Sequence, residues 1–254
     1  MVGIIGGSGV YNLPWLEDSQ EQVVDTRYGE SVVKVGYVDG LEVAFITRHG
    51  KGHKTPPQAI NYRANLLTLS EFGVTDIVST YAVGAIDERM QTGDFVIPTQ
   101  FIDFTSGRAS SFFDEPGKVL HVDVTEPYSK KIREHIQEAM VDANQLFFPE
   151  ATYVCTNGPR YETPAEIKMF SMLGGSVVGM TGVPEVVLAA ELGIPFASIA
   201  VVTNMAAGIS KNKLTHQEVM DIFSKRIDDL SNILRSICQT LSVNPSNVNP
   251  PEAM

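Results

Sequence analysis

The sequence predicts an α/β fold of three layers, with a central mixed sheet flanked by helices. Short runs of apolar and β-branched residues recur along the chain, and several are apolar almost throughout, which is typical of strands covered on both faces. Patterns typical of helices lie between some of these runs. The 254 residues also suffice to bury a substantial core without disulfides or metals.

The predicted strands are the apolar, β-branched runs. They lie at residues 2–5, 32–38, 43–47, 76–83, 94–98, 152–156, 176–180 and 196–203. The predicted helices have apolar residues at three- and four-residue spacing. They lie at residues 56–73, 127–144, 164–175, 184–193 and 215–241.

Local signals mark the ends of several predicted helices. Three begin with a capping box, in which a threonine is followed three residues later by Glu or Gln. These pairs are Thr55 with Gln58, Thr163 with Glu166, and Thr215 with Glu218. Two predicted helices end at glycines that are typical of C-terminal caps, Gly73 and Gly193.

The chain is expected to form one domain. No internal repeat or linker interrupts the pattern, so the domain is predicted over residues 1–242. Residues 243–254 are rich in Pro and Asn and are predicted to be a flexible tail.

The composition argues against several classes of protein. A net charge of −11 disfavours nucleic acid or an anionic membrane as a partner. The two cysteines form no CxxC motif, which indicates a reducing cytoplasm rather than a disulfide framework. Neither a long apolar run nor a secretory leader is apparent, so we expect no membrane span and no secretion.

Two segments that follow predicted strands offer groups that bind anions. GIIGGSGV places Ser8 in a glycine turn, although Asn12 at the third glycine position excludes a dinucleotide fingerprint. TRHGKGHKTPP is the densest cationic cluster, and it contains Arg48 and His49. A structural turn and a solvated basic loop are the alternatives. No metal site is expected, because His49 and His53 lack an evident third ligand.

Further segments carry polar or small residues where a strand ends or a helix begins. Each residue has a structural alternative as a strand end, a helix cap or part of the core. They are Tyr81 and Ala82 in STYAVGAI, Glu162 in GPRYET, Met180 and Thr181 in GMTGVPE, Asn204 in VVTNMAAGIS, and His216 at the start of the last predicted helix.

In this order, these segments resemble the family that joins trimeric purine nucleoside phosphorylases and methylthioadenosine phosphorylases. The resemblance runs from residue 3 to about residue 220, and its most specific motifs are GGSG, RHG, NGPRY and GMTGVPE. It implies the three-layer fold of the purine and uridine phosphorylases. It also implies phosphate as co-substrate with no cofactor, and a homotrimer or a dimer of trimers.

The resemblance implies that phosphate attacks C1′ of a purine nucleoside, giving the free base and ribose 1-phosphate. The enzyme must then hold the phosphate near C1′ and stabilise the departing purine. The phosphate-binding residues carried over from the family are Ser8, Arg48, His49, Tyr81, Ala82 and Thr181.

The resemblance implies that Asn204 is the catalytic residue and that it stabilises the departing purine. An amide can accept from purine N7–H and donate to a 6-keto oxygen, which suits hypoxanthine and guanine. Adenine-specific relatives have Asp at this position and again two residues later, where this chain has Ala206. Glu162 favours the same choice, because a carboxylate accepts from N1–H of a 6-oxopurine but repels the unprotonated N1 of adenine.

The remaining substrate-binding residues also follow from the resemblance. Tyr161 would pack on the base and Met180 against the sugar. Met205 and Ala206 would complete the substrate site beside Asn204. His216 would bind the ribose 5′-OH and, with Glu162 and Asn204, set the specificity.

The sequence therefore predicts a 6-oxopurine nucleoside phosphorylase of purine salvage, acting on inosine and guanosine. An S-methyl-5′-thioinosine phosphorylase shares the same preference at the base and is the first alternative. A methylthioadenosine phosphorylase, a hydrolase that uses water, and a non-catalytic nucleoside-binding protein are the others.

Overall fold

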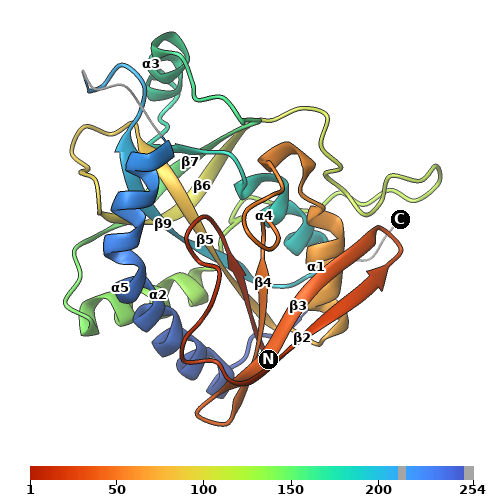
Figure 1. Cartoon of the computed structure of the whole chain (residues 1–254). Helices are drawn as coiled ribbons and strands as arrows, with labels where there is room; N and C mark the ends of the chain where they lie inside the picture. Colours follow the sequence, from red (N-terminus) through yellow and green to blue (C-terminus); the bar gives the residue numbers. More distant parts are fainter. Residues whose placement is uncertain (211–215, 249–254) are drawn as a thin grey trace.

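The computed structural model describes residues 1–210 and 216–248, and for residues 216–219 it describes the backbone only. The described residues form nine strands in one mixed sheet (Figure 1). The strands are β1 (Val2–Gly6), β2 (Glu17–Thr26), β3 (Gly29–Val38), β4 (Leu41–Thr47), β5 (Asp76–Ala85), β6 (Phe95–Phe104), β7 (Phe147–Thr156), β8 (Val177–Gly179) and β9 (Phe196–Met205).

The sheet closes on itself at one end. Its order is β2-β3-β4-β1-β5-β8-β7-β6-β9, and β9 also pairs with β5. Strands β5, β8, β7, β6 and β9 therefore form a closed ring, while β1 to β4 extend from β5 as an open sheet. The predicted central mixed sheet is confirmed, and the ring is a feature that the strand pattern did not reveal.

Helices cover both faces of the sheet. They are α1 (Tyr62–Glu71), α2 (Lys130–Asp142), α3 (Pro164–Met172), α4 (Gly182–Glu191) and α5 (His216–Val243), with a short 3₁₀ helix at Pro57–Ala59. Helices α2 and α5 share one apolar cluster with one face of β1 and β4, and α1 and α4 share another with the opposite face. Figure 1 shows these two helix layers, so the three-layer prediction holds.

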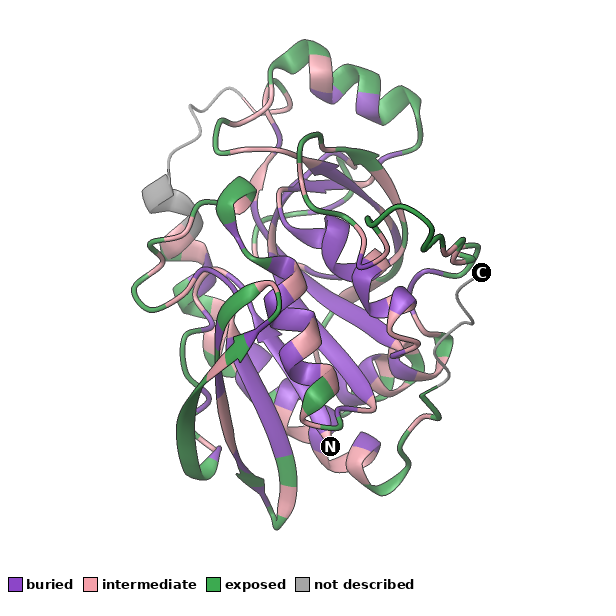
Figure 2. Ribbon diagram, turned by 90° about the vertical axis from the view of Figure 1, so that its right-hand side faces the viewer, coloured by how far each residue is buried: buried purple, intermediate pink, exposed green. Residues whose placement is uncertain are grey.

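Alternate side chains along the central strands enter the two clusters. Ile4 and Phe45 pack toward α5, whereas Ile5 and Ile46 pack toward the other layer. This period of two explains why these strands are apolar throughout. Figure 2 shows the result, a sheet that is buried along most of its length.

Strand β2 was missed by the sequence analysis. Its sequence EDSQEQVVDT is mostly polar, and most of its residues are exposed. It pairs with β3 alone, at the outer edge of the sheet. An edge strand with little apolar contact gives no periodic hydrophobic signal.

The helix starts agree with the sequence at one position and differ at another. The capping box of Thr163 and Glu166 is confirmed at the start of α3. The box predicted at Thr55 is wrong, because Ile60 is extended and α1 begins only at Tyr62, where the Asn61 side chain accepts from the Ala64 N–H. Thr215 lies outside the described residues.

The two predicted glycine caps are confirmed. Gly73 follows α1 with a φ of +75° and Gly193 follows α4 with a φ of +68°. In both cases the next residue donates its N–H back to the last turn of the helix. This is the bonding that a left-handed C-terminal cap provides.

The described part of the predicted tail contacts the rest of the molecule. Helix α5 continues to Val243, and the N–H of Ser246 then donates to the buried carboxylate of Asp76 at 3.0 Å. The Lys131 ammonium also donates to the Asn244 carbonyl at 2.6 Å.

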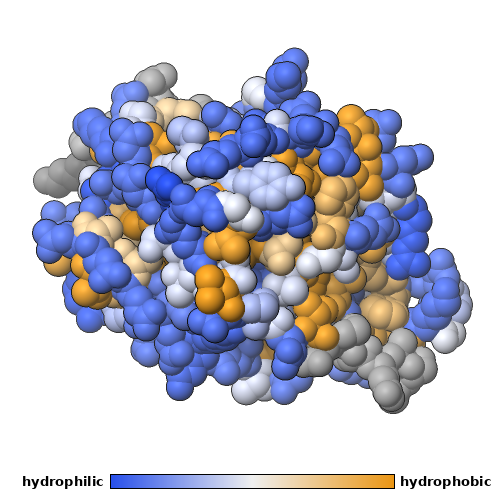
Figure 3. Space-filling model, turned by 90° about the horizontal axis from the view of Figure 1, so that it is seen from below, coloured by the Kyte–Doolittle hydropathy of each residue, from blue (hydrophilic) through white to orange (hydrophobic). Residues whose placement is uncertain are grey.

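None of the helices in the described ranges has the length and apolar character that crossing a bilayer requires. On the face seen in Figure 3, hydrophilic residues predominate and apolar residues gather in small groups between them.

Candidate active site

A gap in the sheet locates the candidate site. Strand β1 pairs with β5 only as far as Ser79, and β8 begins to pair with β5 at Gly84. Within the described residues, no strand pairs with residues 80–83 on this edge, although β9 continues along the other edge. The gap lies where two neighbouring strands diverge, which is the usual position of ligand sites in α/β sheets.

A cavity of about 550 Å³ opens at this gap. Nine of the predicted site residues line it, although they come from distant parts of the chain. They are Ser8, Arg48, His49, Ala82, Tyr161, Glu162, Met180, Thr181 and Asn204.

Three predicted site residues have side chains outside the cavity lining. Tyr81 is buried and its hydroxyl donates to Glu185 at 3.1 Å. Its side chain points away from the cavity because neighbouring residues of a strand point to opposite sides of the sheet. Ala206 is buried among the apolar residues at the base of α3, and Met205 packs against the main core. The side chain of His216 lies outside the described residues.

The turn after β1 brings Ser8 to the cavity. Gly7 donates its N–H to the Thr80 hydroxyl at 2.9 Å, which ties the turn to the open edge of β5. A Cβ at Gly7 would lie 2.4 Å from the Thr80 carbonyl oxygen and 2.6 Å from Arg48 Nη1. Only glycine therefore allows the turn and the guanidinium to approach so closely.

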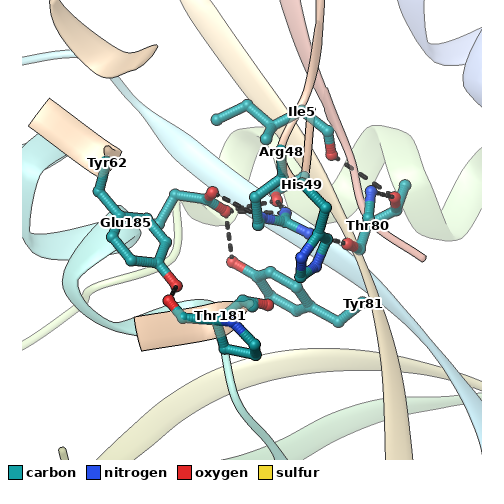
Figure 4. Close-up of polar contacts among 12 residues, drawn as sticks. Ile5, Arg48, His49, Tyr62, Thr80, Tyr81, Thr181 and Glu185 are labelled. Carbon is teal, nitrogen blue, oxygen red and sulfur yellow. Dashed lines mark hydrogen bonds and ion pairs between the residues drawn. The ribbon is translucent and has the colours of Figure 1, made fainter. Parts of the chain in front are cut away.

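Arg48 forms an ion pair with Glu185, a residue that the sequence analysis did not single out. Its Nε and Nη2 donate to the two oxygens of Glu185 at 2.8 and 3.0 Å, and both side chains are buried (Figure 4). Nη2 also donates to the Ser79 hydroxyl, and Nη1 donates to the Thr80 carbonyl at 3.0 Å. A guanidinium has five N–H groups, so these four bonds leave one, on Nη1.

The electrostatics of this pair follow from its burial. Burial alone would lower the pKa of Arg48, but the charge of Glu185 outweighs it and raises the pKa above the ordinary value. The hydroxyls of Ser79 and Tyr81 donate to the same Glu185 oxygen at 2.6 and 3.1 Å. Figure 4 shows Arg48 and Tyr81 pointing at this carboxylate from two sides. The two-point hydrogen bonding that a guanidinium can offer to an anion is therefore directed to Glu185.

His49 is held as a neutral ring. Burial and the neighbouring Arg48 charge lower the pKa of His49 to about 3. Its Nδ1 lies 2.8 Å from the Thr55 carbonyl oxygen, and because a carbonyl only accepts, Nδ1 carries the proton. The other ring nitrogen, Nε2, is then an acceptor.

The segment that follows His49 forms one wall of the cavity. His53, Lys54, Thr55, Pro56 and Pro57 all line it. The rings of His49 and His53 stack with centroids 4.0 Å apart. The predicted basic cluster is thus the cavity wall itself. Its proline pair, which the sequence analysis placed in a helix, gives the wall its extended and 3₁₀ conformation.

Glu162 and Asn204 lie at the cavity with hydrogen-bonding positions to spare. Glu162 Oε1 accepts from the Thr156 hydroxyl at 2.7 Å. Asn204 Oδ1 accepts from the Thr203 hydroxyl at 3.1 Å, and Nδ2 donates to the Met205 carbonyl at 3.0 Å. These bonds fix the amide orientation and leave one lone pair and one N–H for a ligand.

Sequence reasoning missed Glu185, although it stands in the GMTGVPE motif. The signal was a carboxylate in a helix whose other residues, apart from Glu191 at its end, are apolar, because such a carboxylate is buried only when it is paired. Thr80 was missed as well, since its side chain acts on the Gly7 turn through tertiary contact. Among the described residues, no group of three or more His, Cys, Asp or Glu side chains could hold a metal ion.

Comparisons with known proteins find relatives that match nearly the whole chain. The model of the Phosphorylase superfamily matches residues 1–239. The 6-oxopurine nucleoside phosphorylase of Pyrococcus furiosus is 48% identical over 239 residues, covering 92% of this chain and 90% of that protein. A probable S-methyl-5′-thioinosine phosphorylase of Methanothermobacter thermautotrophicus is 46% identical over 250 residues, covering 97% of this chain and 86% of that protein.

A solved structure is similar over nearly the whole chain. It is methylthioadenosine phosphorylase from Schistosoma mansoni in complex with adenine. The TM-score is 0.92 at 32% identity, with 96% of this chain and 92% of that chain covered.

Proposed function

Because this chain belongs to the phosphorylase superfamily, we propose that it catalyses the phosphorolysis of 6-oxopurine nucleosides. It is a purine nucleoside phosphorylase, which transfers a pentosyl group from inosine or guanosine to phosphate. The observation that carries the proposal is that Glu162 and Asn204 line the same cavity as Ser8, Arg48 and Thr181. One cavity thus holds groups suited to an oxyanion and groups suited to a 6-oxopurine.

In the proposed reaction a phosphate oxygen forms a bond to C1′ while the bond from C1′ to N9 breaks. The electron pair of the broken bond goes to the purine, which takes up a proton at N7 from solvent, and the ribose 1-phosphate releases the proton of the phosphate. Asn204 Oδ1 accepts from that N7–H while Nδ2 donates to the 6-keto oxygen, and Glu162 accepts from N1–H. The bond from Nδ2 to the 6-keto oxygen strengthens as negative charge grows on the base, which is the condition for catalysis.

The phosphate is bound by several groups at the gap. Ser8 and Thr181 supply hydroxyls, Ala82 supplies its backbone at the open edge of β5, and Arg48 supplies its remaining N–H. His49 Nε2 accepts from the hydroxyl of the monoprotonated phosphate dianion. Arg48 acts here through one N–H and its position, because Glu185 already balances its charge.

The test compares kcat/KM for inosine, guanosine, methylthioinosine and methylthioadenosine at saturating phosphate. We expect the 6-oxopurine nucleosides to be the best substrates. We also expect the formation of free base to require phosphate. A preference for methylthioadenosine would contradict the roles of Glu162 and Asn204. Turnover without phosphate would indicate a hydrolase.

S-Methyl-5′-thioinosine is the second candidate substrate, because the Methanothermobacter relative covers 97% of this chain. The two candidates differ only at the ribose 5′ position. His216, which the resemblance assigns to the 5′-OH, has its side chain outside the described residues. The ratio of kcat/KM for inosine and methylthioinosine decides between them.

We also propose a homotrimer, or a dimer of trimers, in a reducing cytoplasm. The family resemblance supports the assembly, and two free, buried cysteines support the compartment. Light scattering should give three or six times the mass of the 27.7 kDa chain. A monomer would contradict the proposed assembly.

A further inference from the structure

Tyr153 of β7 lies directly behind the cavity wall formed by Met180 and Thr181. Its side chain is fully buried. Its hydroxyl oxygen accepts from the backbone N–H groups of Thr181 and Gly182, both at 3.3 Å. Burial raises the pKa of Tyr153 well above its ordinary value, so the hydroxyl stays neutral.

The two glycines of the GMTG turn are explained by the same ring. Neither Gly179 nor Gly182 has a positive φ, so their backbone conformation does not require glycine. A Cβ at Gly179 would lie 2.4 Å from the Tyr153 hydroxyl oxygen, and a Cβ at Gly182 would lie 2.7 Å from Tyr153 Cε1. The turn therefore follows the surface of the ring at both of its ends.

Two residues of β7 accept the N–H groups at the start of helix α4. Thr181 is the N-cap residue, but its side chain makes no capping hydrogen bond. A threonine in this position normally accepts from the first N–H groups of the helix. Here Tyr153 accepts from the Thr181 and Gly182 N–H groups and Cys155 Sγ accepts from the Val183 N–H, so the Thr181 hydroxyl is left for the cavity that it lines.

We propose that Tyr153 is a positioning residue for the phosphate site. It fixes the backbone of the turn, presents the Thr181 hydroxyl to the phosphate and holds Met180 at the cavity. The inference rests on the proposed function, because it concerns the phosphate site in the same cavity. Tyr153 itself touches neither the phosphate nor the nucleoside.

The main test compares Tyr153→Phe with Tyr128→Phe. Tyr128 is also fully buried, but its hydroxyl has no hydrogen-bond partner within the described ranges, so it is a matched control. In Tyr153→Phe we expect KM for phosphate to rise about tenfold, with KM for inosine nearly unchanged. Tyr128→Phe should leave both constants unchanged. Equal KM values for phosphate in the two variants would overturn the proposal.

Amide hydrogen exchange provides a test that does not depend on activity. The Thr181 and Gly182 amides should exchange faster in Tyr153→Phe than in the wild type or in Tyr128→Phe. If the wild type lacks phosphorolysis but the exchange changes as expected, the proposed function fails and the placement of Tyr153 stands. Unchanged exchange would overturn the placement.

A double variant tests the packing. Gly182→Ala should lower kcat/KM for phosphate at least tenfold, because the new methyl group meets the Tyr153 ring. In a Tyr153→Leu background the added Gly182→Ala should change little, since the space is then open. If Gly182→Ala lowers the activity by the same factor in both backgrounds, the ring does not shape the turn.

Discussion

At the level of single residues, we assign the choice of purine to two side chains whose hydrogen bonds the fold satisfies only in part. Asn204 is fixed by Thr203 and Met205, and Glu162 by Thr156. Each retains hydrogen-bonding capacity toward the cavity. A ligand that matches these groups gains directional bonds, and one that does not leaves buried polar groups unpaired.

Replacing Asn204 by Asp should weaken the preference for 6-oxopurines. The carboxylate cannot donate to the 6-keto oxygen, and it meets the Met205 carbonyl as a second acceptor. We expect kcat/KM for inosine to fall about 100-fold and the ratio of adenosine to inosine activity to rise. Full adenosine activity is not expected, because Glu162 still opposes adenine N1. An unchanged ratio of the two kcat/KM values would refute the role of Asn204.

The protonation of Glu162 should control base binding at acidic pH. Burial raises the pKa of Glu162 above its ordinary value, although the hydrogen bond from the Thr156 hydroxyl partly offsets this. As the pH falls through this raised pKa, the carboxyl takes up a proton, and N1–H exchanges a charged acceptor for a neutral and weaker one. The inhibition constant of hypoxanthine should therefore rise on acidification, beginning at a higher pH than an exposed glutamate would give.

The control is Glu162→Gln, whose amide oxygen accepts from N1–H at every pH. Its inhibition constant should stay flat over the same range. If both proteins show the same acid limb, another group is titrating.

At the level of elements, helix starts depend on more than the capping motif. The Thr163 box succeeds because its proline is the first helical residue. The Thr55 motif also begins with Thr-Pro, but a second proline and an extended Ile60 delay the start of helix α1 until Tyr62. Local sequence therefore located the helix and misplaced its first turn.

Two substitutions distinguish these starts. Asn61→Ala removes the cap of α1 and a hydrogen bond to the Tyr28 carbonyl, so the free energy of unfolding should fall by about 1–2 kcal/mol. Thr55→Ala should change it much less, because the Thr55 side chain caps no helix. Urea denaturation of the two variants measures the difference, and a larger loss in Thr55→Ala would contradict the structure.

At the level of the whole molecule, one buried ion pair joins the two halves of the chain. Arg48 follows β4 and Glu185 lies in α4, 137 residues later. The pair lies beneath the gap in the sheet, where β1 and β8 diverge from β5. It therefore fixes the floor of the cavity as well as the packing of α4 on the sheet.

Replacing Glu185 by Gln should destabilise the fold strongly. The Arg48 charge would remain buried without a counter-charge, which should lower the free energy of unfolding by about 3 kcal/mol. Glu115→Gln is the control, because its pair with Lys118 is exposed and should contribute little. Similar denaturation midpoints for the two variants would show that the buried pair does not stabilise the protein.

Much of the fold was predictable because its signals are local. Strands buried on both faces can be recognised in the sequence by continuous apolar runs, as in β5 and β9. Strand β2 could not be recognised in this way, because an exposed edge strand has no buried face. The site was predictable only as a set of motifs, and Tyr81 shows the limit, since its neighbour Ala82 reaches the cavity while its own side chain points to Glu185.

The sequence by itself determined the layers, most of the elements and nine of the residues that line one cavity, because periodicity, caps and motifs are properties of short segments. Only the tertiary structure decided that the sheet closes into a ring and leaves a gap at β5. It also decided that Arg48 forms a buried ion pair with Glu185 and that Tyr153 supports the turn at Thr181. These features depend on contacts between segments far apart in the chain, whose pairing no short stretch of sequence encodes.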